Sequence, residues 1–184
     1  MFVSVFGSSC TTEESPLYEE ARRLGRLLGQ RGWQVATGGY NGLMAAVSQG
    51  AAEAGGQVLG ATCRCFEAGG LRANRWVQRE ICFPTLEERI HFLISQCDAA
   101  VGLTGGIGTL SEVAMAWSLV QAREVSPRPL PLVGPAWVSV LRAFFQATDG
   151  LIRPEDRLLL TPCLSPEEAL GHLTRLAAGL PQSS

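Results

Sequence analysis

The sequence predicts an α/β fold, a three-layer open parallel sheet with helices on both faces. Short β-branched or apolar runs alternate with longer segments of helical period along the 184 residues, which is the pattern of βαβ units. Hydrophobic residues make up 46% of the chain and charged residues 17%, a balance typical of globular proteins. The length suits a single hydrophobic core, so we expect residues 1–184 to form one Rossmann-like domain.

The strands and helices follow from this alternation. We expect strands at 2–6, 33–37, 57–61, 98–103, 130–133 and 157–161. We expect one helix to begin at Pro16 and others to cover 41–54, 85–97, 107–122, 135–147 and 165–179. The segment 63–83 holds a Gly-Gly pair, four arginines and Trp76, so we interpret it as an irregular, functional excursion.

The first helix has a clear start. Ser15 can cap it, Pro16 suits its first position, and Glu19 and Glu20 fall in its positive first turn. Helical spacing predicts its buried face at Leu17, Ala21, Leu24 and Leu28. In the helix at 85–97 the same spacing predicts a buried stripe, with Arg89 about a quarter turn away from it; its members are Leu86, Ile90, Leu93, Ile94 and Cys97.

Composition excludes several functions. All 15 basic residues are Arg, so a lysine Schiff base with pyridoxal phosphate and a Walker-type phosphate loop are both impossible. A formal charge of −2 without a basic cluster argues against nucleic-acid binding. Two histidines offer little for a metal site. The scattered cysteines suggest free thiols, and no apolar run could span a bilayer, so we expect a cytoplasmic protein that binds no membrane.

Three turns rich in glycine or hydroxyl groups each follow an expected strand. They are Gly7-Ser8-Ser9, the stretch from Thr37 to Gly42, and the stretch from Thr104 to Thr109. In an open parallel sheet such turns meet at one edge, and ligands bind there, where the strand order reverses between 2–6 and 98–103. The turns therefore predict a ligand site, although glycines after strands are also common in ordinary tight turns.

The third turn is the most informative of the three. Its glycines let the backbone approach a ligand, and the helix that follows offers unpaired N–H groups suited to a phosphate. Thr109 and Ser111 could add hydroxyl donors, and Glu112, about one turn into the helix, could accept hydrogen bonds from a sugar. Taken alone, Glu112 is more typical of a surface or helix-start carboxylate and Arg89 of a solvated or ion-paired side chain than of a functional site.

The stretches TGGYNGLMAAVSQGAAEAGG (37–56) and ERIHFLISQCDAAVGLTGGIGTLSE (88–112) resemble the Lonely Guy family, long mislabelled as possible lysine decarboxylases. Its characterised members are Rossmann-like, usually dimeric phosphoribohydrolases, which release an adenine-type base and ribose 5-phosphate from a nucleoside 5′-monophosphate. The family signature P-G-G-x-G-T-x-x-E matches Thr104 to Glu112, with threonine in place of proline. In the family's E-R-K pattern, Glu88 and Arg89 agree, but Ile90 replaces lysine.

The resemblance implies roles for individual residues. Arg89 and Glu112 would be catalytic, and the glycine turns would hold the substrate and its phosphate. The binding residues expected in these turns are Gly7, Ser8, Gly38, Gly39, Gly42, Met44, Gly105, Gly106, Ile107, Gly108 and Thr109. The missing lysine and proline mark a divergent branch of the family, and the absence of any lysine rejects the decarboxylase label on chemical grounds.

Two functions therefore remain open. The first is a nucleoside 5′-monophosphate phosphoribohydrolase that needs no metal or cofactor, with Glu112 stabilising an oxocarbenium-like transition state. The alternative is a nucleotide- or cofactor-binding carrier or sensor without turnover, suggested by Ile90. A dinucleotide oxidoreductase is disfavoured because no G-x-G-x-x-G turn follows the first strand. We also expect a homodimer, built on apolar helices that carry Trp117, Val120, Trp137, Phe144 and Phe145.

Overall fold

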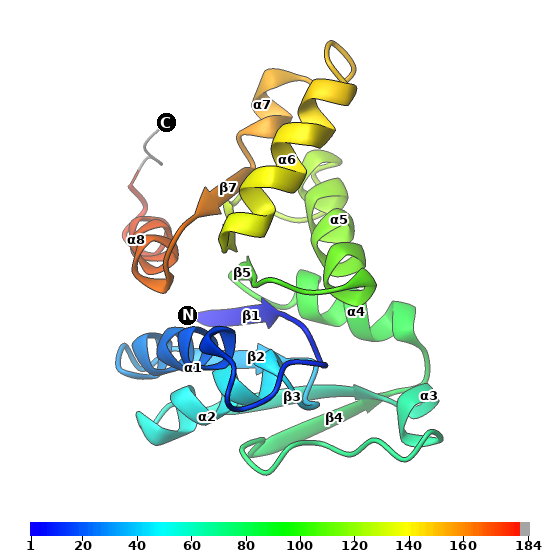
Figure 1. Ribbon diagram of the computed structural model, residues 1–184, viewed down its shortest axis with the longest axis vertical. Helices are drawn as coiled ribbons and strands as arrows, with labels where there is room; N and C mark the ends of the chain where they lie inside the picture. Colours follow the sequence, from blue (N-terminus) through cyan, green and yellow to red (C-terminus); the bar gives the residue numbers. More distant parts are fainter. Residues whose placement is uncertain (181–184) are drawn as a thin grey trace.

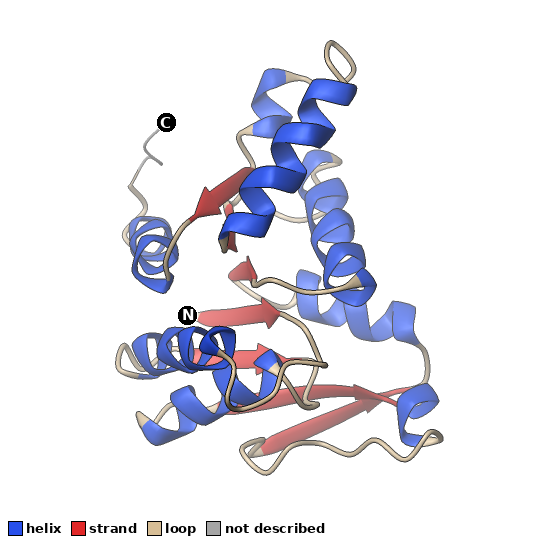
Figure 2. Ribbon diagram, in the orientation of Figure 1, coloured by secondary structure: helices blue, strands red, loops and turns tan. Residues whose placement is uncertain are grey.

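The computed structural model describes residues 1–180, which form a seven-stranded, all-parallel sheet with helices on both faces (Figures 1 and 2). This confirms the predicted fold class. The strands are β1 (Phe2–Phe6), β2 (Gln34–Thr37), β3 (Val58–Cys63), β4 (Arg79–Phe83), β5 (Ala99–Gly102), β6 (Leu130–Val133) and β7 (Leu160–Cys163). The helices are α1 (Pro16–Gly29), α2 (Leu43–Glu53), α3 (Arg64–Glu67), α4 (Leu86–Ser95), α5 (Ile107–Gln121), α6 (Pro135–Ala147), α7 (Pro154–Arg157) and α8 (Pro166–Ala177).

The strand order β4-β3-β2-β1-β5-β6-β7 places β1 at the centre of the sheet. Val3 of β1 pairs with Val35 of β2 on one side and with Ala99 of β5 on the other. The chain therefore winds outward from β1 to β4, returns, and continues outward in the other direction from β5. This reversal leaves the carboxyl ends of β1 and β5 side by side, the usual position of a ligand crevice in such sheets.

Two hydrophobic cores separate the sheet from its two helical layers. Alternate strand residues point to opposite faces, so Val5 packs toward α1, α2 and α8 whereas Phe6 packs toward α4, α5 and α6. In Figure 1 the first group of helices lies to the left of the strands, and α4 and α5 lie to the right. Trp137 is buried in the second core, where its indole Nε1–H donates to the carbonyl of Leu103 at 3.2 Å.

The predicted start of α1 is confirmed, but its buried face differs by one residue. The Ser15 side chain accepts a hydrogen bond from the backbone N–H of Leu17, as an N-cap does. Leu17 is 36% exposed, whereas Tyr18 is buried and donates its hydroxyl to Gln49 of α2 at 3.0 Å. In α4, likewise, Leu86 at the first position is 41% exposed, and the buried residues begin at Arg89 and Ile90.

The prediction of an irregular excursion at 63–83 is wrong in part, because the segment contains α3 and the edge strand β4. That strand was missed because its exposed Arg79 and Glu80 interrupt any apolar run. The last strand lies at Leu160–Cys163 rather than 157–161, since Pro154 starts a helical turn that extends to Arg157. Where a single helical turn is followed by a short apolar run, hydrophobic periodicity does not show at which residue the strand begins.

Glycines allow α1 and α2 to cross at very short range. A methyl group at Gly25 would overlap the carbonyl oxygen of Val47, and one at Gly50 would overlap the carbonyl oxygen of Arg22. Side chains at the rim of this crossing form an exposed ion pair, in which Arg22 contacts Glu53 at 2.9 Å. The pair of helices thus forms a closely packed layer over β1 and β2.

Both edges of the sheet carry features that oppose further strand pairing. On β4 the side chains of Arg79, Glu80 and Cys82 are exposed. On the opposite edge, β7 has only four residues, and its Pro162 has no N–H group to donate. Of the described helices in residues 1–180, none is long and apolar enough to cross a membrane.

Candidate functional site

The three predicted turns meet at the carboxyl edge of the sheet. The backbone N–H of Ser8, after β1, donates to the carbonyl of Thr104, after β5, at 3.3 Å. The carbonyl of Ser8 in turn accepts from the N–H of Leu43, the first residue of α2, at 2.8 Å. The turn after β1 therefore lies between the other two and joins them through its backbone.

Two glycines are required by this close approach. Gly42 has a φ of +67°, and a Cβ at this position would overlap the carbonyl oxygen of Ser8. A Cβ at Gly105 would overlap the hydroxyl of Thr109, whose side chain is buried beneath the turn. Larger residues at 42 or 105 would consequently separate the three turns.

The start of α5 is open, as an anion site would need. Gly106 is its N-cap residue, and among residues 1–180 no side chain accepts a hydrogen bond from the first N–H groups of the helix. Side chains cap α1, α4 and α8, through Ser15, Thr85 and Ser165, whereas α2 and α6 also begin after a glycine without such a cap. A Cβ at Gly106 or Gly108 would meet no atom within 4 Å, so there is space above the turn. The uncapped amides and the positive end of the 15-residue helix favour an anion such as phosphate.

Arg89 and Glu112 form a buried ion pair at the same edge. Their exposures are only 5% and 7%, and Arg89 Nη1 lies 3.2 Å from Glu112 Oε1. Arg89 Nε also donates to the carbonyl of Ala61 near the end of β3, at 2.7 Å. A Cβ at Gly38 would overlap the guanidinium, so this glycine makes room for it. Arg89 thus links the ends of β2 and β3 to α5.

The Glu112 carboxyl titrates near neutral pH. Burial raises its pKa from 4.5 to about 7, and the nearby positive charge and hydrogen bond of Arg89 only partly oppose that rise. The carboxyl can therefore hold or release a proton under physiological conditions. Chemically it could act as an acid, as a hydrogen-bond acceptor, or as a charge that keeps Arg89 in place.

The turn from Gly38 to Gly42 is largely buried, so it supports the ligand edge from within the protein rather than forming an open loop. Gly38, Gly39, Gly42 and Met44 are all buried, whereas Ser8 is half-buried. The third turn differs, because Gly105, Gly106, Ile107 and Gly108 are exposed and Thr109 is not. The exposed surface of the predicted binding set is thus concentrated at the start of α5.

Two residues that the sequence did not single out hold this support together. The Tyr40 hydroxyl accepts from the backbone N–H of Cys63 at 2.8 Å and donates to the carbonyl of the same residue at 3.2 Å. The Asn74 side chain donates to the carbonyls of Gly39 and Tyr40 at 3.0 and 2.9 Å. Asn74 therefore ties the 63–83 segment to the second turn, a contact between residues far apart in sequence.

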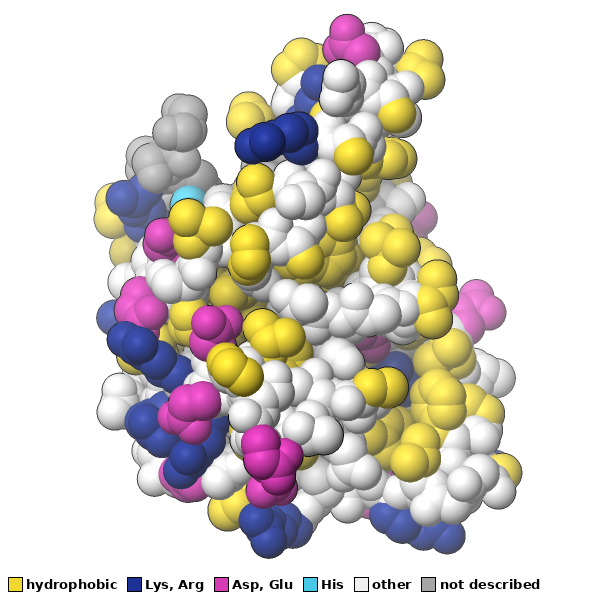
Figure 3. Space-filling model, in the orientation of Figure 1, with side chains coloured by type: hydrophobic (Ala, Val, Ile, Leu, Met, Phe, Trp, Pro, Cys, Tyr) yellow, Lys and Arg dark blue, Asp and Glu magenta, His cyan; other side chains and the backbone are white. Residues whose placement is uncertain are grey.

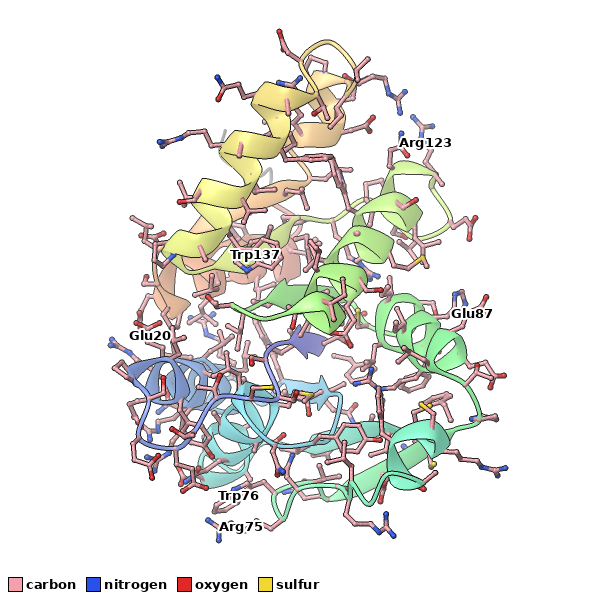
Figure 4. All side chains as sticks on the ribbon, turned by 45° about the vertical axis from the view of Figure 1, so that its right-hand side comes forward. Glu20, Arg75, Trp76, Glu87, Arg123 and Trp137 are labelled. Carbon is pink, nitrogen blue, oxygen red and sulfur yellow. The ribbon has the colours of Figure 1, made fainter. Side chains whose placement is uncertain are left out.

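Trp76, which the sequence suggests as a base-stacking residue, lies beside Arg75 in Figure 4, at the lower left of the molecule. The Arg75 guanidinium lies 4.9 Å from the centre of its ring. One face of the indole is thereby engaged in a cation–π contact. Base stacking by Trp76 stays a prediction.

The part of the chain that carries the three turns also defines its family. A model of the SLOG cluster4 family matches residues 1–123, or 123 of the 184 residues. The chain belongs to the SLOG cluster4 family. Among its relatives is the cytokinin riboside 5′-monophosphate phosphoribohydrolase of Mycobacterium tuberculosis, 31% identical over 117 residues. That match covers 63% of the SLOG chain and 62% of the mycobacterial enzyme, so it extends over less than two thirds of either protein.

Solved structures resemble this SLOG protein over nearly its whole length. The molybdenum cofactor binding protein of Rippkaea orientalis has a TM-score of 0.75 at 24% identity, and 96% of each chain is covered. The molybdenum cofactor carrier protein of Chlamydomonas reinhardtii has a TM-score of 0.71 at 24% identity, with 96% of the SLOG chain and 98% of the carrier covered. At this identity the likeness establishes a shared fold.

Proposed function

We propose that this protein is a carrier that binds a phosphorylated small molecule without converting it. The observation that carries the proposal is the contrast between an open α5 start and a closed Arg89–Glu112 pair. The uncapped amides of α5 suit a phosphate. The carboxylate that a hydrolase would turn toward the sugar instead accepts a hydrogen bond from Arg89 and is 7% exposed.

The ligand class that we favour is a phosphate-bearing pterin of the molybdenum-cofactor type. Support comes from the fold shared with two proteins named for binding that cofactor, over 96% of this chain. This chain has room for the phosphate of such a ligand: the space above Gly106 and Gly108 is open, and a terminal phosphate could fill it. The rest of such a ligand would extend over the exposed turn, beside Ser8.

A second candidate function is the phosphoribohydrolase activity implied by the Lonely Guy resemblance. It is favoured by one observation, namely that Glu112, with a pKa of about 7, lies with Arg89 at the edge that carries the open turn. In this reaction water would cleave the bond between the ribose and the base, its hydroxyl going to C1′ of the ribose and its remaining proton to the base nitrogen, which gives ribose 5-phosphate and the free base. Against it, the family's lysine position holds Ile90, which is 7% exposed in the second core.

One experiment separates the two candidates. The purified protein is mixed with molybdenum cofactor released from a molybdoenzyme, passed through a gel-filtration column, and assayed for co-eluting molybdenum and pterin fluorescence. In parallel it is incubated with adenosine 5′-monophosphate and other nucleoside monophosphates, and ribose 5-phosphate is measured. Co-elution without ribose 5-phosphate supports the carrier, whereas release that Glu112→Gln abolishes supports the hydrolase. If the protein neither binds nor cleaves any of these compounds, both proposals fail.

A matched pair of variants tests the position of the phosphate. Gly106→Ala places a methyl group over the first turn of α5 without straining the backbone, because the φ of Gly106 is −93°. We expect it to weaken phosphate-ligand binding about tenfold, or roughly 1.4 kcal/mol. Gly171→Ala on α8 also adds a methyl into open space and should leave binding unchanged. Equal affinities for the two variants would place the phosphate elsewhere.

We also propose a homodimer through the exposed face of α5, in a cytoplasmic protein whose residues 1–184 form one domain. Glu112 is the single charged residue of α5 and is buried, so the exposed face of this helix has no formal charge. Hydrophobic side chains gather on the right-hand side of Figure 3, whereas charged ones gather over α1 and α2 at the lower left. The large apolar side chains exposed on α5 are those of Ile107, Leu110 and Met115.

The apolar residues expected at this dimer interface differ in exposure, and Trp117 and Phe145 are half-buried. Val120 and Trp137 are buried within the chain and cannot form an interface, whereas Phe144 is 43% exposed. A charge on α5 tests the proposal: Met115→Glu should give a monomer in analytical ultracentrifugation at a concentration where the wild type is a dimer. A monomeric wild type would refute it.

A further inference from the structure

Two thiols lie in contact at the rim of the candidate site. Cys63 ends β3, and Cys65 lies in the first turn of α3, at the carboxyl ends of β3 and β4 (Figure 1). Their sulfur atoms are 3.0 Å apart. Cys63 is fully buried, whereas Cys65 is exposed. One sulfur is therefore accessible to a reagent in solution, and the other lies directly behind it.

The spacing fits a disulfide better than a metal site. Two thiolates on a tetrahedral zinc ion, with Zn–S bonds of about 2.3 Å, would lie about 3.8 Å apart. Within residues 1–180, no group of three or more His, Cys, Asp or Glu side chains could hold a metal ion. A disulfide bond of about 2.05 Å needs the two sulfurs to approach by only about 1 Å.

The surroundings divide the roles of the two cysteines. The backbone N–H and carbonyl of Cys63 are both held by the Tyr40 hydroxyl, and Cys63 pairs with Phe83 of β4, so Cys63 is fixed. Burial raises the pKa of its thiol, which makes Cys63 the poorer first nucleophile. Cys65 is thus the thiol that reacts first, and closing the bond would move Cys65 and the short helix α3 rather than the strand.

We propose that Cys63 and Cys65 form a reversible intramolecular disulfide by exchange with a small disulfide such as oxidised glutathione. The Cys65 thiolate attacks one glutathione sulfur and expels the other glutathione as a thiolate. The Cys63 sulfur then attacks Cys65 in the mixed disulfide and expels the second glutathione. The protein loses two electrons and two protons, and two molecules of reduced glutathione form. In a reducing compartment such disulfides are transient and redox-sensing.

Formation of the disulfide would also affect the second turn of the ligand edge, from Thr37 to Gly42. Phe66, next to Cys65, packs edge-on against Tyr40, with ring centres 5.6 Å apart. A shift of α3 would disturb this contact and hence the turn in which Tyr40 lies. This consequence rests on the proposed carrier function, and it predicts that the oxidised protein binds the phosphorylated ligand more weakly than the reduced protein.

The disulfide is tested without any ligand. The folded protein is equilibrated with glutathione buffers of increasing oxidised fraction, its remaining thiols are alkylated, and it is digested with trypsin. Because trypsin cleaves after Arg31, Arg64 and Arg72, the disulfide would hold peptide 32–64 to peptide 65–72, and mass spectrometry detects the linked pair. We expect this pair in the wild type and its disappearance on return to reduced glutathione.

Variants on exposed cysteines provide the control. Cys65→Ser should abolish the linked peptide, whereas Cys82→Ser, at an exposed position on neighbouring β4, should form it as the wild type does. Glutathione adducts without a 63–65 link would overturn the proposal. Ligand affinity is then measured on the reduced and oxidised forms. No binding by the reduced form would refute the carrier function alone, whereas equal binding by both forms would overturn the link between the disulfide and the site.

Discussion

Replacing Glu112 by Gln is expected to remove one defined component of the protein's pH-dependent stability. The pKa of this carboxyl is about 7 in the folded protein, against a normal value of 4.5, because burial disfavours its charged form. Between these two values the folded state holds a proton that the unfolded state has released. The free energy of unfolding therefore falls as the pH rises through this window, and it levels off above about pH 7.

The magnitude follows from the two pKa values. Each pKa unit corresponds to about 1.4 kcal/mol, so Glu112 contributes about 3 kcal/mol that is present below about pH 4.5 and lost by about pH 7.5. Loss of the partner of the Arg89 guanidinium adds a difference in unfolding free energy between wild type and variant that does not change with pH. The quantity to follow is the difference in unfolding free energy between wild type and Glu112→Gln, which cancels the other titrating groups.

The assay is urea unfolding at several pH values from 4.5 to 8. The difference between wild type and Glu112→Gln should fall by about 3 kcal/mol across this range, and the slope should reach at most about 1.4 kcal/mol per pH unit. Glu87→Gln is the control, because Glu87 is exposed on α4 and points away from the molecule in Figure 4. A difference that stays constant with pH would refute the assignment of a buried, neutral-pH carboxyl to Glu112.

Three further predictions on packing and helix capping, with Gly171→Ala as a control variant, are tested by thermal or urea unfolding. Gly50→Ala forces a methyl group onto the Arg22 carbonyl and should destabilise the protein by about 1–3 kcal/mol, whereas Gly171→Ala in open space should be slightly stabilising; the reverse order would contradict the described helix crossing. Leu93→Ala empties a fully buried position and should cost about 2–5 kcal/mol, and a loss below 1 kcal/mol would argue against that burial. Ser15→Ala removes the α1 cap and should cost about 1 kcal/mol, so an unchanged stability would exclude the cap.

The sequence predicts the interior of the fold well because the central strands are buried on both faces. In β1, residues 2–6 are apolar except for the buried Ser4, and such nearly continuous apolar segments are typical of strands in parallel sheets. The edge strand β4 lacks this signal because only part of it is covered. The choice between Leu17 and Tyr18 as the buried residue of α1 depends on the neighbouring helix α2, which local periodicity does not describe.

At the candidate site, the topology rule for parallel sheets brings the three turns to one edge, and the motif spacing draws attention to Arg89 and Glu112. Neither source of information reveals that these two side chains pair with each other, since they lie 23 positions apart. The supporting contacts of Tyr40 and Asn74 are equally long-range. Hydrogen bonds from a side-chain hydroxyl or amide to backbone groups far away in the sequence produce no periodic pattern, so they cannot be predicted from the sequence.

The two strands at the margins of the sheet have a consequence for how copies of this chain can meet. Fibril-like growth requires a long strand with free backbone donors and acceptors, onto which the next molecule can align. Neither edge strand of this sheet meets that requirement. One edge carries the charged residues Arg79 and Glu80, and the other is the short β7, which contains a proline. Concentrated protein should therefore resist amyloid-type aggregation, and contacts between copies are directed to the helical surfaces.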